Sequence, residues 1–174
     1  MEEIGFGGSC HWCTEAIFLS LKGVNAVRQG WIAADGPNMT FSEGVIVEYN
    51  PEVITLYTLI AIHLFTHSCT SNHSMRSKYR SAVYTFNAGQ RQISRDAIQS
   101  LQKEFSDPVI TQVLPCEDFK LNTEDFLNYY YSNPEKPFCE NIVNPKLKLL
   151  LAQFADQVNT EKLIHLNRGT DRTG

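Results

Sequence analysis

The 174-residue chain is expected to fold as one α+β domain, a two-layer sandwich in which helices pack on a mixed, mainly antiparallel sheet. Segments with strand and helix patterns alternate along the chain, but they do not form the long series of strand–helix–strand units that a parallel sheet requires. The length and an apolar content of 43% are sufficient for one sizeable core. A doubly wound α/β fold is the second choice.

The first 50 residues predict three strands and one helix. A short strand at 2–8 ends in glycines, and apolar residues at helical spacing predict a helix at 12–21. Alternating apolar residues predict strands at 24–33 and 43–50. Gly36-Pro37-Asn38 forms the turn between these two strands, because glycine and proline favour turn geometry.

The middle of the chain continues this alternation. An apolar helix is expected from 55 to 65 with Thr55 as its N-cap, followed by a Ser- and Thr-rich loop. Residues 79–86 and 107–114 have the composition of strands, and 87–105 has the spacing of an amphipathic helix.

Two more helices are expected near the C-terminus. The segment 122–133 opens with capping residues, and 144–158 carries Pro145 in its first turn. We therefore expect a single domain over residues 1–158 and a partly disordered tail over 159–174.

Charge and hydropathy exclude several classes of protein. A net charge of −4 without a basic block argues against nucleic acid as a partner. No apolar run approaches the roughly 20 residues that span a bilayer. The first residues lack the basic and apolar regions of a signal peptide, so a cytoplasmic, reducing setting is expected. No heptad repeat indicates an assembly, so a monomer is expected.

The cysteines point to thiol chemistry. An odd number in a reducing compartment does not indicate a structural disulfide framework, which leaves free thiols, a redox pair or a metal site. The five are Cys10, Cys13, Cys69, Cys116 and Cys139.

Cys10 stands at the mouth of the first predicted helix, behind a Gly-Gly-Ser turn. The first turn of a helix has unpaired backbone N–H groups and the positive end of the helix dipole. Both favour the thiolate, so a cysteine there has a depressed pKa and reacts faster. A cysteine at such a junction can also be a small buried apolar residue, and this position alone does not decide between the two interpretations.

The surrounding stretch "GSCHWCTEAIFLSLKGV" resembles the A-type peptide methionine sulfoxide reductases, whose signature is Gly-Cys-Phe-Trp-Gly-x-Glu before an apolar helix. In this comparison Cys10 takes the nucleophile position, and Trp12 and Glu15 match the tryptophan and the glutamate. His11 replaces the phenylalanine and Cys13 replaces the glycine.

The resemblance continues in order over about residues 4–150. "EGVIVEYNPEV" places Glu43 on the family's catalytic carboxylate, and "KYRSAVY" places Tyr79 on an active-site tyrosine. "NPEKPFCENIVNPKLKLL" places Cys139 on a recycling cysteine. The resemblance implies a ferredoxin-like α/β plait for the fold.

The resemblance also implies a reaction, the thiol-dependent reduction of methionine S-sulfoxide, free or in proteins, as oxidative stress repair. Cys10 would be the nucleophile and become a sulfenic acid, Glu43 the general acid, and Tyr79 a hydrogen-bond donor to the sulfoxide oxygen. Trp12 would hold the S-methyl group. An intramolecular disulfide would follow, and an external thiol such as thioredoxin or dithiothreitol would reduce it without any bound cofactor.

Several departures from the family affect the expected pocket. The loop before Glu43 is shortened, and Phe41 stands nearest to a second active-site tyrosine, so that hydroxyl is lost. Ser74 replaces a pocket aspartate, and His11 makes the methyl-binding wall polar. Losing one oxyanion donor can cost on the order of 3 kcal/mol of transition-state stabilisation. His11 and His73 are candidates to replace the lost hydrogen-bond donor. One alternative to an active reductase is a catalytically impaired member of the family.

Two further alternatives remain open. The spacing Cys10-x-x-Cys13 at a helix N-terminus is typical of thiol–disulfide oxidoreductases and redox sensors, and it makes Cys13 a second candidate, beside Cys139, for resolving Cys10. A zinc site is the other alternative, although only the first two candidate ligands have a usual spacing. The candidate ligands are Cys10, Cys13, His67, Cys69 and His73.

Overall fold

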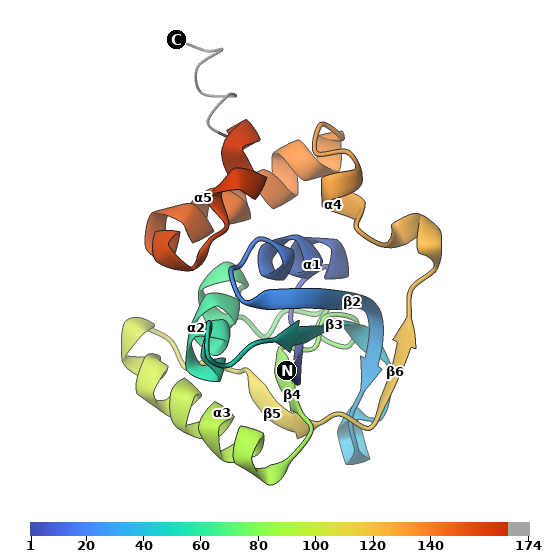
Figure 1. Ribbon diagram of the computed structural model, residues 1–174. Coiled ribbons are helices and arrows are strands. Elements are labelled where there is room, and N and C mark those ends of the chain that lie inside the picture. Colours follow the sequence, from blue (N-terminus) through green and yellow to red (C-terminus); the bar gives the residue numbers. More distant parts are fainter. Residues whose placement is uncertain (167–174) are drawn as a thin grey trace.

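The computed structural model describes residues 1–166 and contains a six-stranded sheet in the order β5-β4-β1-β3-β2-β6 (Figure 1). Its central part is a β-α-β-β-α-β unit in which the strand order 4-1-3-2 is that of a ferredoxin-like fold. This confirms the predicted α+β class. The unit comprises β1 (Glu2–Gly7), α1 (His11–Leu19), β2 (Val24–Ala33), β3 (Ser42–Tyr49), α2 (Leu56–Thr66) and β4 (Ala82–Thr85).

Two short strands extend the sheet at its edges. β5 (Gln112–Pro115) pairs parallel with β4, and β6 (Asp118–Leu121) pairs antiparallel with β2. All other pairs are antiparallel, so the sheet is mixed and mainly antiparallel, as predicted. β6 was not predicted, because four residues with mostly exposed side chains carry no recognisable alternation.

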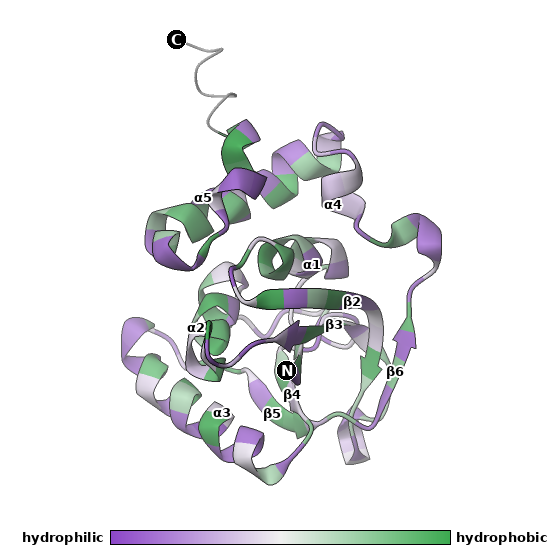
Figure 2. Cartoon of the chain, viewed as in Figure 1, coloured by the Kyte–Doolittle hydropathy of each residue, from purple (hydrophilic) through white to green (hydrophobic). Residues whose placement is uncertain are grey.

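The main core lies between the sheet and the helices. α1 is covered by the sheet on one side and by the C-terminal segment on the other (Figure 1), and seven of its nine residues are buried. α2 is buried on most sides, with Thr55 as its N-cap as predicted. In contrast, α3 (Ala88–Leu101) carries both hydrophilic and hydrophobic residues (Figure 2) and is amphipathic, with most of its residues not buried.

The C-terminal segment forms a further layer over α1. It contains α4 (Tyr129–Ser132), a π-helical turn (Cys139–Val143) and α5 (Asn144–Gln153), which contact α1 (Figure 1). α5 is shorter than the predicted 144–158. Short 3-10 turns occupy Gly36–Asn38, Gln102–Glu104, Glu124–Phe126, Ala155–Gln157 and Thr160–Leu163.

The domain boundary expected at residue 158 stays a prediction. Val158 bridges to Leu21, and the backbone N–H of Asn159 donates to Ser20. Leu163 is 1% exposed, so part of the expected tail packs on the domain. Residues 167–174, the remainder of that tail, lie outside the described residues.

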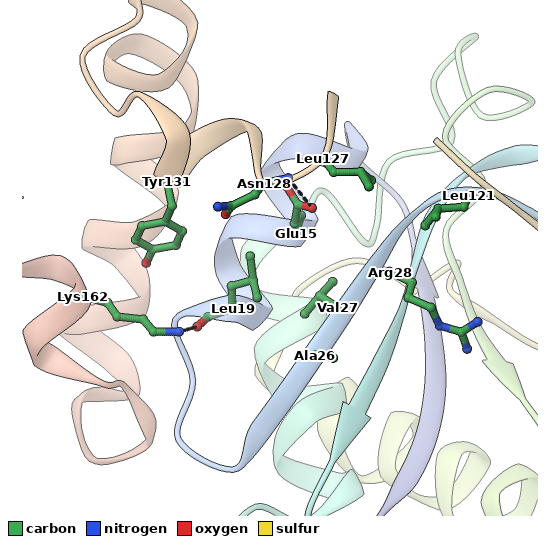
Figure 3. Close-up of a pocket in the computed structure, with 10 residues that line it drawn as sticks. All are labelled: Glu15, Leu19, Ala26, Val27, Arg28, Leu121, Leu127, Asn128, Tyr131 and Lys162. Carbon is green, nitrogen blue, oxygen red and sulfur yellow. Dashed lines mark hydrogen bonds between the residues drawn. The ribbon is translucent and has the colours of Figure 1, made fainter. Parts of the chain in front are cut away.

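The single helix predicted at 122–133 is wrong, because a buried carboxylate interrupts it. Asn128 adopts a left-handed conformation with φ of 53°, and only four residues of α-helix follow. The backbone N–H groups of Asn128 and Tyr129 donate to the two carboxylate oxygens of Glu15 on α1, at 2.9 and 3.1 Å. Figure 3 shows the bond from Asn128. Glu15 therefore caps α4 across the core, in addition to standing near the start of its own helix.

The strand predicted at 79–86 begins three residues later, at Ala82. Residues 79–81 instead close a loop against β3, and this difference positions part of the site described below. Within residues 1–166, no helix has both the length and the apolarity needed to cross a bilayer.

Candidate active site

Cys10 is the N-cap residue of α1, held there by a glycine turn. Gly8 has φ of +145°, a conformation that favours glycine, and a Cβ atom on it would lie 2.6 Å from the ring of His67. The carbonyl of Cys10 accepts the first helical hydrogen bond from Thr14. The predicted position of this thiol at the helix mouth is therefore present in the structure.

Cys13 and the helix backbone stabilise the Cys10 thiolate. The pKa of Cys10 is lowered, chiefly because the thiol of Cys13 donates a hydrogen bond to it, with the backbone N–H groups of Trp12 and Cys13 as further donors. Burial and the charge of Glu43 act in the opposite direction. The same interaction raises the pKa of Cys13, so Cys10 is the more easily ionised of the two thiols and Cys13 keeps its proton.

Glu43 lies near the start of β3 and is 4% exposed. Burial raises the pKa of its carboxyl, while Lys78 and the hydroxyl of Tyr79 partly oppose this shift. One carboxyl oxygen, Oε2, is buried without a hydrogen-bond partner among the described residues. A raised pKa favours the protonated form of a carboxyl, the form that can serve as a general acid.

His11 contacts the other oxygen of Glu43, with 3.1 Å between Nε2 and Oε1. Burial lowers the pKa of His11 to about 4, so the imidazole is neutral. Its Nδ1 faces the carbonyl of Gly30 at 3.4 Å and its Nε2 faces the amide nitrogen of Asn122 at 3.3 Å. With the proton on Nδ1, facing the Gly30 carbonyl, Nε2 is the acceptor nitrogen, and it faces both the amide of Asn122 and the carboxyl of Glu43.

Lys78 and Arg80, the residues before and after Tyr79, make hydrogen bonds to β3 that hold Tyr79 beside Glu43. The hydroxyl of Ser42 donates to the carbonyl of Lys78 at 2.8 Å and accepts from the backbone N–H of Arg80 at 2.8 Å. The backbone N–H of Glu43 also donates to the Lys78 carbonyl, at 2.9 Å. Burial, followed by the charge of Glu43, raises the pKa of Tyr79, so its hydroxyl remains a donor.

A cavity of about 310 Å³ lies beside Cys10. It brings Cys10, Cys13 and Tyr79 together with His73, whereas His11, Phe41 and Glu43 are not among the residues that line it. The lining residues are Gly8, Ser9, Cys10, Cys13, Ser68, His73, Met75, Tyr79, Ile142 and Lys146. A larger apolar cavity of about 660 Å³, between α1, β2 and Tyr131 (Figure 3), contains none of the candidate catalytic residues.

Trp12 and Phe41 lie outside the 310 Å³ cavity. The indole of Trp12 is half-buried and stacks on Tyr129, with ring centroids 4.0 Å apart and planes within 8°. The ring of Phe138 meets it edge-on at 5.5 Å. Phe41 is covered by the ammonium group of Lys120, 4.4 Å from the ring centroid. Their expected contact with substrate stays a prediction.

Cys139 opens the π-helical turn and is completely buried. Burial raises the pKa of its thiol. Cys139 is among the groups that act on the pKa of Cys13, but not among those that act on the pKa of Cys10, and it does not line the cavity beside Cys10. All five cysteines are free thiols.

The zinc alternative gains no support from the structure. No group of three or more potential ligands is close enough to hold a metal among residues 1–166. The His67 ring nitrogens contact the carbonyl of His63 and the hydroxyl of Ser81 instead. Ser74, at the position of the family's aspartate, is exposed.

Two lysines at the site were not predicted. The ammonium group of Lys78 lies 5.2 Å from the ring centroid of Tyr79 and lowers the pKa of Glu43, while Tyr79, followed by the charges of Glu43 and Cys10, raises the pKa of Lys78. Lys146 lines the cavity and lowers the pKa of Cys13, although its effect is smaller than that of Cys10. The adjacency of Lys78 to Tyr79 in the chain is a signal that could have identified the first, whereas Lys146 reaches the site only through the fold.

Comparison with known proteins agrees with this geometry. The family model described as peptide methionine sulfoxide reductase matches residues 2–159. The chain is 30% identical to the peptide methionine sulfoxide reductase MsrA of Deinococcus radiodurans, over 90% of this chain and 84% of that protein. It is also 30% identical to MsrA of Trichodesmium erythraeum, over 91% of this chain and 99% of that protein.

Solved structures support the fold. Reduced Mxr1 from Saccharomyces cerevisiae matches with a TM-score of 0.68 at 21% identity, covering 79% of this chain and 88% of that one. Methionine sulfoxide reductase A of Corynebacterium diphtheriae matches with a TM-score of 0.66 at 23% identity, covering 76% and 75%. A structure of Mxr1 in complex with Trx2 has a TM-score of 0.57 at 19% identity, covering 72% and 82%. With the family match over nearly its whole length and a helix-mouth cysteine beside a buried carboxyl, this chain belongs to the peptide methionine sulfoxide reductase family.

Proposed function

We propose that the protein reduces methionine S-sulfoxide, free or in peptides and proteins, to methionine as a repair of oxidative damage. The proposal is carried by one arrangement: Cys10 is stabilised as a thiolate within electrostatic reach of Glu43, a buried carboxyl whose pKa is raised. A nucleophile and an acid that hold opposite protonation states at the same pH are what this reduction requires.

In the first step, the Cys10 thiolate attacks the sulfoxide sulfur. The oxygen takes the Glu43 proton, and Tyr79 donates a hydrogen bond to it as charge develops. Methionine leaves and Cys10 becomes a sulfenic acid, so the sulfoxide gains the two electrons that Cys10 loses. One proton is consumed, and Glu43 regains it from solvent.

In the second step, a second thiol attacks the sulfenic sulfur, a disulfide forms and water leaves. We assign this role to Cys13 ahead of Cys139, because Cys13 already contacts Cys10 and lines the same cavity. An external dithiol, thioredoxin or dithiothreitol, then reduces the disulfide. The structure of a family member with Trx2 supports a partner of this kind.

The substrate-binding roles of Trp12 and His73 rest on different grounds. Trp12 lies outside the cavity beside Cys10, so its contact with the S-methyl group rests on the family resemblance and on its half-buried indole. His73 lines the cavity and His11 does not, so His73 is the better candidate for the lost second donor. An unchanged turnover rate in His73→Ala would remove this assignment.

The test is a reductase assay on the full chain with methionine S-sulfoxide and dithiothreitol. We expect methionine to form, and Cys10→Ser to abolish its formation. Cys116→Ser, which changes a half-buried thiol in the smaller second core, is the matched control and should keep full activity. Absence of methionine together with reduction of insulin disulfides would replace the proposal with a thiol–disulfide oxidoreductase.

The cellular setting is part of the proposal. Five free thiols suit a reducing cytoplasmic compartment, and we expect the protein to act as a monomer without nucleic acid or membrane partners.

A further inference from the structure

The loop that carries Tyr79 also lines a second cavity, of about 430 Å³, which the proposed reaction does not use. Most of its lining residues are polar. They include Thr40 before β3, Gln112 on β5, and Asn72, Arg76 and Arg80 from the loop. No carboxylate is among the lining residues described, so the two arginines give this cavity a net positive charge.

Arg80 is a buried cation without a carboxylate partner among residues 1–166. It is 6% exposed. Its Nη2 donates to the backbone carbonyl and hydroxyl of Thr40, at 2.7 and 3.1 Å, and its Nη1 donates to the hydroxyl of Tyr84 at 3.2 Å. These oxygens satisfy hydrogen bonds but carry no full charge. Burying a charge without an opposite charge costs free energy, which a bound anion would offset.

Arg76 is half-buried and also lacks a carboxylate partner among residues 1–166. It donates to four backbone carbonyls, and none of its partners in the described part of the chain is a carboxylate. Burial lowers its pKa. Both guanidinium groups thus have unneutralised charge, and both line one cavity.

We propose that this cavity binds a small oxyanion, such as a carboxylate or phosphate group, between Arg76 and Arg80. The planar N–H groups of guanidinium match the oxygens of these anions better than they match a halide. The hydroxyl and amide groups of Thr40, Asn72 and Gln112 supply additional donors.

An anion at this position would connect to the reactive cysteine through the backbone. Nη1 of Arg76 donates to the carbonyls of Gly8 and Tyr79, at 2.8 and 2.9 Å. Gly8 shapes the turn before Cys10, and Tyr79 is the proposed donor to substrate. A bound oxyanion would therefore brace both segments from outside the catalytic cavity.

The experiment is calorimetric titration of the full chain with sodium phosphate and with sodium acetate, at an ionic strength held constant with chloride. Saturable binding of one ion is expected. Binding of both anions indicates a site for single carboxylates, as on peptides, and binding of phosphate alone indicates a site for dianions. Absence of saturable binding by either anion overturns the proposal.

Asn72→Asp places a carboxylate in the cavity and tests the location. Because Asn72 is exposed, this variant should fold, and we expect the dissociation constant for phosphate to rise at least about tenfold by like-charge repulsion. Asn25→Asp, at the opposite end of the sheet, adds the same charge and should leave the affinity unchanged. Equal effects of the two variants would refute the site. Arg80→Gln is a weaker test, because it also leaves Thr40 and Tyr84 without their donor.

Discussion

Removing the thiol of Cys13 should make Cys10 markedly less reactive. In the structure, the hydrogen bond from Cys13 is the largest contribution that lowers the pKa of Cys10. Hydrogen bonds to charged groups contribute about 1.5–3 kcal/mol, and a thiol is a weak donor. Because of this weak donor we take a value just below that range, about 1.4 kcal/mol, so the Cys10 thiolate fraction in Cys13→Ala falls about tenfold at a pH below its pKa.

The assay is the pH dependence of Cys10 alkylation by iodoacetamide, read by mass spectrometry of the peptide that contains Cys10. The rate follows the thiolate fraction, so its rise with pH should move to higher pH in Cys13→Ala. Cys13→Ser retains a donor at the same position and should stay close to the unmodified protein. The difference between alanine and serine separates the hydrogen bond from a packing effect at this buried residue.

Cys69→Ala is the matched control, because Cys69 is equally buried, at 2% exposed, and does not contribute to the pKa of Cys10. Its alkylation profile at Cys10 should be unchanged. An unchanged profile in Cys13→Ala, or the same displacement in the alanine and serine variants, would refute the role assigned to Cys13.

Three further predictions follow from the site. Glu43→Gln should lower turnover in the reductase assay by about 10²–10⁴-fold, because it removes the general acid. Its thermal midpoint at pH 7 should not fall, because a neutral group of similar size replaces the buried carboxyl. Gly8→Ala should lower the free energy of unfolding, measured in urea, by about 1–3 kcal/mol, because Gly8 has φ of +145° and an added Cβ would clash with His67. Gly36→Ala should have a smaller effect, because φ there is +53° and no atom lies within 4 Å of the added Cβ. Because burial lowers the pKa of His11 to about 4, the unfolded chain binds a proton there near pH 6.5 and the folded chain does not, so stability falls between pH 6.5 and 4. His11→Phe should reduce that fall when urea midpoints are compared at pH 5 and 7.

The sequence was sufficient for the order of the elements and for most strands and helices, because their apolar periodicity is local. The interrupted helix near residue 128 could not be predicted. Its cause is the carboxylate of Glu15, 113 residues earlier, which takes the backbone N–H groups of Asn128 and Tyr129. A capping residue that comes from another helix has no signature in the segment it caps.

The same limit applies to the site. Cys10 could be singled out from its place behind glycines at a helix start, and the resemblance supplied Glu43 and Tyr79. Neither the pattern around Cys10 nor the resemblance predicted the contact between His11 and Glu43. This contact depends on Asn122, 111 residues away, which orients the imidazole. The sequence shows that a histidine replaces the family's phenylalanine. Only the fold shows that this histidine contacts the carboxyl of Glu43.

In the proposed mechanism, the hydrogen bond between Cys10 and Cys13 also sets the order in which the two thiols react. While Cys10 is a thiolate, it holds the proton on Cys13 and raises the pKa of that thiol, so Cys13 cannot compete as a nucleophile. Once Cys10 has become a neutral sulfenic acid, the largest cause of that raised pKa is gone, whereas Lys146 continues to favour the charged form of Cys13. Cys13 therefore becomes easier to ionise only after Cys10 has been oxidised. The same hydrogen bond thus favours the thiolate of Cys10 and keeps Cys13 protonated until Cys10 has become a sulfenic acid that Cys13 can attack.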